Sequence, residues 1–131
     1  MTKWMMMMVS LLGLSSCCTH VITDEEMTLT AIGETSVRMG MYLRQHHQYP
    51  AALTELPERV GYMNRTTDGW KRSLIYSVDT NGVITLMSLG RDGKVGGTGE
   101  DQDVSRRFRT KNPDGSWCVD DELWIVKDEI K

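Results

Sequence analysis

Residues 88–104 read SLGRDGKVGGTGEDQDV, and this stretch says more about the fold than any other part of the chain. It places five glycines and four acidic residues directly after a strand-like run. Glycines let the backbone turn through positive φ and direct carbonyl oxygens inward. Asp92, Asp101 and Asp103 can add carboxylate oxygens at the ~2.3–2.6 Å that calcium prefers. The same residue types dominate solvated turns, so the composition alone allows either a cation-binding loop or a plain turn.

Two further landmarks precede this block, namely Tyr49 followed by proline and the DGW motif at residues 68–70. Taken in order, the three resemble the globular domain of the major pseudopilin of bacterial type II secretion systems, protein G. The resemblance covers residues 28–104. It implies an α+β fold in which one long N-terminal helix ends near the Tyr-Pro pair and packs on a small antiparallel sheet. It also implies that the Gly/Asp-rich loop binds calcium.

The resemblance carries a ligand set onto this chain. It makes Asp92 the first carboxylate ligand and Asp101 and Asp103 the later ones, with the Leu89 carbonyl and Thr98 as further oxygen donors. Other templates fit less well. An EF-hand read from Asp92 would put a lysine and a glycine where oxygen ligands are needed, and the loop lacks the Gly-Lys-Ser/Thr ending of a phosphate-binding loop.

The first residues predict export and a lipid anchor. Lys3 precedes an apolar run at residues 4–14, and the sequence LSSC at residues 14–17 resembles a bacterial lipobox. The run is shorter than the ~20 residues of a transmembrane helix and is typical of a signal peptide, here residues 1–16. Cleavage before Cys17 would leave an acylated cysteine on a short linker, residues 17–22. An ordinary signal peptide is the alternative.

The lipid anchor also sets this chain apart from true pseudopilins. Those proteins begin with a prepilin peptidase site followed by a long apolar helix that anchors and polymerises them, and neither is present here. A lipid at Cys17 would replace the anchor only. Position 18 is Cys rather than Asp, so the inner-membrane retention signal is absent. We therefore expect a protein of the cell envelope that faces the periplasm, and we favour the outer membrane over the inner membrane as its location. Its expected partners are secretion-system or envelope proteins.

The net charge bears on which partners the protein binds, and the cysteines bear on whether a disulfide forms. The net charge is −3, and the sequence has no basic stripe with interleaved aromatics. Its one basic cluster, Arg106, Arg107, Arg109 and Lys111, is short, so nucleic acid is not an expected partner. Once Cys17 is acylated, Cys18 and Cys118 remain. In an oxidising periplasm they can form a disulfide, but two thiols are an equal alternative because Cys18 lies beside the anchor.

Residues 23–131 are expected to form one domain. Thr23 and Glu26 form a capping box at the start of a helix, and an apolar stripe from Leu29 to His46 gives that helix one buried face before Pro50 ends it. A hairpin follows. The three-residue turn ending at Gly82 pairs Val78 with Ile84, Tyr76 with Leu86 and Ser77 with Thr85, which keeps one face apolar.

The C-terminal stretch predicts two more strands, residues 105–110 and 117–126, around an NPDG turn. Trp117 and Trp124 extend the same sheet or form a partner-binding edge. No catalytic motif is present, so we expect a non-enzymatic lipoprotein with a structural or protein-binding role linked to secretion. The alternative is a secreted accessory enzyme or inhibitor that uses the surface bearing the C-terminal tryptophans.

Overall fold

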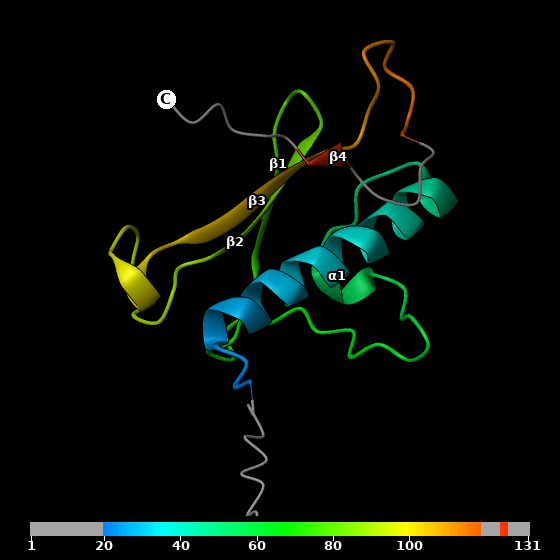
Figure 1. The fold of residues 1–131 in the computed structure, drawn as a ribbon. Coiled ribbons are helices and arrows are strands. Elements are labelled where there is room, and N and C mark those ends of the chain that lie inside the picture. The colour runs from blue at the N-terminus through cyan, green and yellow to red at the C-terminus, as the bar shows by residue number, and fades with distance from the viewer. Residues whose placement is uncertain (1–19, 119–123, 126–131) are drawn as a thin grey trace, which may run out of the picture.

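A computed structural model describes residues 20–118 and 124–125 and shows one helix packed on an antiparallel sheet (Figure 1). The sheet order is β1-β2-β3-β4, and the predicted α+β class is confirmed. The predicted signal peptide, Cys17 and Cys18 lie outside the described residues. None of the described helices has the length and apolar character needed to cross a membrane. The elements are α1 Asp24–His46, η1 Leu53–Glu55, β1 Ile75–Val78, β2 Val83–Ser88, η2 Gly99–Asp101, β3 Val104–Arg109 and β4 Trp124–Ile125.

Both ends of α1 are set by local hydrogen bonds. The Thr23 hydroxyl accepts from the Glu26 amide at 3.1 Å, and the Glu26 carboxylate accepts from the Thr23 amide at 2.8 Å. The predicted capping box is therefore confirmed. At the other end His47 takes a left-handed conformation with φ 51, and its amide donates to the Leu43 carbonyl at 2.8 Å. Helices commonly end in this way.

The core lies between α1 and the sheet. Ile32, Met39 and Leu43 from the helix pack with apolar residues that alternate along β2, where burial switches with every residue. Because side chains of a strand alternate between its faces, only one side of the sheet faces α1. The predicted buried stripe of the helix is confirmed at Ile32, Met39 and Leu43. It is wrong at His46, which is exposed and stacks on Tyr42 with the ring centroids 4.2 Å apart.

The hairpin has the predicted register, with Val78 opposite Ile84 and Tyr76 opposite Leu86. Gly82 has φ 74, a conformation that side chains other than glycine adopt rarely. β3 pairs with β2 along its whole length, and β4 adds to the outer edge of β3. The C-terminal stretch therefore extends the sheet. Of the predicted strand 117–126, only β4 and a bridge between Lys111 and Trp117 are strand-like among the described residues.

A buried arginine organises the connection between α1 and β1. Arg38 is 4% exposed, and its guanidinium donates to the carbonyls of Pro57 at 2.8 Å, Asn64 at 3.0 Å and Leu56 at 3.1 Å. These bonds hold residues 56–64 as a fixed loop beside the helix. The Tyr62 ring in this loop is 54% exposed and lies under the Arg59 guanidinium.

Candidate functional site: the Gly/Asp-rich loop

The 88–104 loop closes the ends of two paired strands. Ser88, the last residue of β2, pairs with Val104, the first of β3, and the Arg91 amide donates to the Glu100 carbonyl at 2.7 Å across the neck of the loop. Gly90 makes this closure feasible. Its φ is 67, and a Cβ there would lie 2.6 Å from the Gln102 carbonyl oxygen. The strands thus fix both ends of the loop.

The base of the loop rests on Asp68, which is 2% exposed. One carboxylate oxygen accepts from the amides of Trp70 at 3.0 Å and Arg72 at 2.8 Å, and the other accepts from the Ser88 hydroxyl at 2.7 Å. Ser88 Oγ in turn accepts from the Gly90 amide at 3.2 Å, and the Arg72 guanidinium donates to the Gly90 carbonyl. A continuous hydrogen-bond network therefore joins the DGW motif to the loop.

The DGW motif also ties the loop to the helix. The Gly69 amide donates to the Thr28 hydroxyl at 2.9 Å, and a Cβ on Gly69 would collide with the Asp24 carbonyl. Glycine is needed where backbones approach so closely. Sequence reasoning used this motif only as a landmark and missed that Asp68 supports the site. An acidic residue directly before Gly-Trp was the available signal.

The loop carboxylates do different things in the structure. Asp103 Oδ2 accepts from the Gly96 amide at 3.1 Å, whereas its Oδ1 is buried and has no hydrogen-bond partner. Asp92 Oδ1 accepts from the Lys94 amide at 2.9 Å. Buried polar oxygens are nearly always paired in folded proteins. A further hydrogen-bond donor or a cation at Asp103 Oδ1 would therefore satisfy the unpaired oxygen of this loop.

Asp101 is held by a neighbouring cation of the protein itself. The Arg91 guanidinium lies 3.0 Å from the Asp101 carboxylate and 2.7 Å from that of Glu100. The hydrogen bond to Asp101, followed by the negative charges around it, raises the pKa of Arg91. This pair is exposed, so its contribution to stability is small. Arg91 supplies positive charge to part of the predicted ligand set.

The five predicted ligands all lie in this loop or at its edge, but the structure does not gather their carboxylates around one point. Among the described residues, no group of three or more His, Cys, Asp or Glu side chains is close enough to hold a metal. The Thr98 carbonyl accepts from the Asp101 amide at 3.2 Å. The donors are nevertheless all oxygen atoms, the type that a hard cation needs, and Asp103 Oδ1 is free to be one of them.

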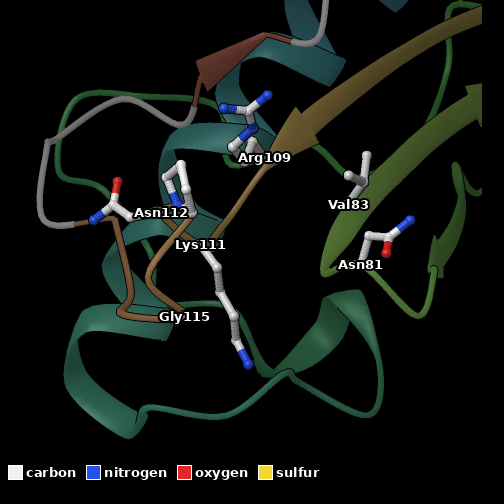
Figure 2. A pocket seen from close by; sticks show the side chains of 7 residues that line it. Asn81, Val83, Arg109, Lys111, Asn112 and Gly115 are labelled. Atoms are coloured by element: carbon white, nitrogen blue, oxygen red, sulfur yellow. The ribbon is translucent and has the colours of Figure 1, made fainter.

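A pocket of about 460 Å³ lies at the opposite end of the sheet from the Gly/Asp-rich loop, beside the start of β2 and the end of β3. Figure 2 shows Arg109 and Lys111 on its walls with their side chains extending in different directions. The Lys111 ammonium lies 4.7 Å from the centre of the Trp117 ring, and that ring meets Tyr49 edge-on at 5.2 Å. Trp117 thus packs against the core. The two cations do not converge on one anion.

Comparison with known proteins agrees with this architecture. The family model for type II secretion system (T2SS), protein G, matches residues 23–107, which run from the helix cap to within β3. A search of curated proteins gave no match. The matched region contains the helix, the hairpin, the DGW motif and the whole Gly/Asp-rich loop. Since it covers well over half of the chain, the protein belongs to the type II secretion system protein G family.

Proposed function

We propose that this protein is a non-enzymatic lipoprotein of the bacterial envelope, anchored through Cys17 and facing the periplasm. Its pseudopilin-like domain would have a structural or protein-binding role in secretion. Family membership supports the link to secretion. The lipobox sequence supports the anchor.

We further propose that the 88–104 loop binds calcium. The unpaired, buried Oδ1 of Asp103 is the observation that carries this proposal. Asp92, Asp101 and Asp103 would hold the ion together with the Leu89 carbonyl and Thr98. A bound calcium supplies positive charge that offsets the mutual repulsion of these carboxylates. Because the loop joins β2 to β3, ordering it would stiffen that end of the sheet.

Arg91 bears directly on this site, since its guanidinium already occupies the Asp101 carboxylate. Binding of a divalent cation by Asp101 competes with this ion pair. Replacing Arg91 with glutamine should therefore raise the affinity for calcium and lower the stability of the ion-free loop. The opposite result, a weaker calcium response, would mean that Arg91 positions Asp101 for the ion.

Thermal unfolding tests the ion site. The full chain carrying Cys17→Ser is stripped with a chelator and unfolded without metal, with magnesium and with calcium. At an ion concentration of about 100 Kd, binding stabilises the folded state by ~2.7 kcal/mol, which is a rise in Tm of about 10 °C for a domain of this size. Asp103→Asn should abolish the rise at nearly unchanged side-chain volume.

Asp114 provides the matched control. It is a loop carboxylate that accepts from Ser116 in the NPDG turn, remote from the ion-binding loop. Asp114→Asn should change the baseline Tm slightly and leave the calcium response intact. An unchanged response in Asp103→Asn would reduce the loop to a turn. An equal response to magnesium and calcium would overturn the assignment of the site to calcium.

A further inference from the structure

An apolar groove runs between the N-terminal half of α1 and the loop that Arg38 holds in place. Its volume is about 310 Å³ and its walls are mostly apolar. Ile22, Met27 and Ala31 line the helix side, and Tyr62 and Met63 line the loop side. Figure 1 shows the segment before α1 and the loop before β1 on the same lower side of the helix.

The rim of this groove collects most of the large hydrophobic side chains that the described residues expose. Met63 is 77% exposed and Val60 is fully exposed. Monomeric soluble proteins rarely present such a cluster without a use for it. Of the exposed large hydrophobic residues, Val21, Ile22, Val60, Tyr62 and Met63 lie on or next to the groove, whereas Ile75 and Val95 lie elsewhere.

The loop that carries these side chains is firmly held. The Asn64 amide donates to the Glu34 carboxylate on α1 at 2.9 Å, and the Asn64 side chain accepts from the Arg59 amide at 2.7 Å. The Arg38 guanidinium donates a hydrogen bond to the Asn64 carbonyl. The exposed apolar residues therefore lie on a loop that these hydrogen bonds hold in place.

We propose that this groove face docks onto the surface of the lipid bilayer, an inference that rests on the proposed acylation of Cys17. Cys17 precedes Ile22 by five residues, and an extended chain spans at most about 3.6 Å per residue. The acyl chains would therefore hold Ile22 within roughly 18 Å of the membrane. Ile22, which lines the groove, is thus among the first described residues after the anchor.

The chemistry of the face suits the interfacial region of a bilayer. Apolar side chains there enter the boundary between headgroups and acyl chains. Arg59 stacks on the Tyr62 ring with its guanidinium 3.6 Å from the ring centre, and Arg65 lies 3.5 Å from the Met27 sulfur. Tyrosine and arginine both combine an apolar body with a polar end.

Photocrosslinking in the acylated mature protein, which begins at Cys17, tests the docking. Met63 is replaced by the photoreactive amino acid p-benzoyl-phenylalanine, and the protein is reconstituted into vesicles of phosphatidylethanolamine and phosphatidylglycerol. Irradiation should give a phospholipid adduct on the protein. The matched control places the same amino acid at Val95, which is 85% exposed in the Gly/Asp-rich loop, and should give severalfold less adduct. Adding Tyr62→Asp should lower the adduct at position 63 with Tm unchanged.

The outcomes separate this inference from the lipid anchor. An acylated protein that floats with vesicles but forms no lipid adduct at position 63 overturns the docking and leaves the anchor standing. Equal adducts at positions 63 and 95 overturn it too, because they show tethering without orientation. A crosslink from position 63 to another protein assigns the groove to a protein partner instead. If intact mass shows no acylation and the chain does not float, the anchor itself fails and the docking fails with it.

Discussion

Replacing Asp68 with alanine should destabilise the domain far more than loss of an ordinary polar side chain. The carboxylate is 2% exposed and accepts from the Trp70 amide, the Arg72 amide and the Ser88 hydroxyl. Each buried donor left unpaired costs about 1–3 kcal/mol. Water can reach the two partly buried amides, so we expect a total of about 3–4 kcal/mol. For a domain of this size that lowers Tm by about 12–16 °C.

Chemical denaturation of the full chain carrying Cys17→Ser measures this loss. Asp79→Ala is the matched control, because Asp79 also accepts from two backbone amides, at 2.8 and 2.9 Å, but in an exposed hairpin turn. It should cost about 1 kcal/mol. A double-mutant cycle between Asp68→Ala and Ser88→Ala should show coupling. A loss for Asp68→Ala no larger than the control, or a cycle without coupling, would refute this role of Asp68.

Three further predictions concern single residues. The hydrogen bond from the Thr23 amide lowers the pKa of Glu26. The contribution of this carboxylate to stability is therefore present above the ordinary glutamate pKa of ~4.3 and is lost as the pH falls through the lowered value. Glu26→Gln should remove that part of the acid dependence of Tm. Burial raises the pKa of Tyr76 to about 12, so ultraviolet titration should show one tyrosine ionising late, with stability lost as the pH rises from about 10 towards that value. Gly90→Ala, at positive φ against backbone oxygens, should cost at least about 1–2 kcal/mol by denaturation, and more than Gly96→Ala, where a Cβ meets open space.

The Gly/Asp-rich loop shows how much a sequence motif alone can predict. The sequence predicted the loop and a set of oxygen donors in it, but it did not show that Arg91 pairs with Asp101 or that Asp103 Oδ1 is left without a partner. Ion pairs inside a long loop depend on the path of its backbone. That path depends on the strands that hold the two ends, so the division of roles among the carboxylates becomes visible only in three dimensions.

The sequence by itself determined the elements whose causes are local. Thr23 and Glu26 start the helix through bonds three residues apart, and the alternation around Gly82 fixes the hairpin register, because a slip by one residue would turn the apolar face outward. The tertiary structure alone decided the roles of Asp68 and Arg38. Ser88 lies 20 residues from Asp68 and Leu56 lies 18 residues from Arg38. Such bonds form only after distant segments of the chain have packed together and removed water from both groups.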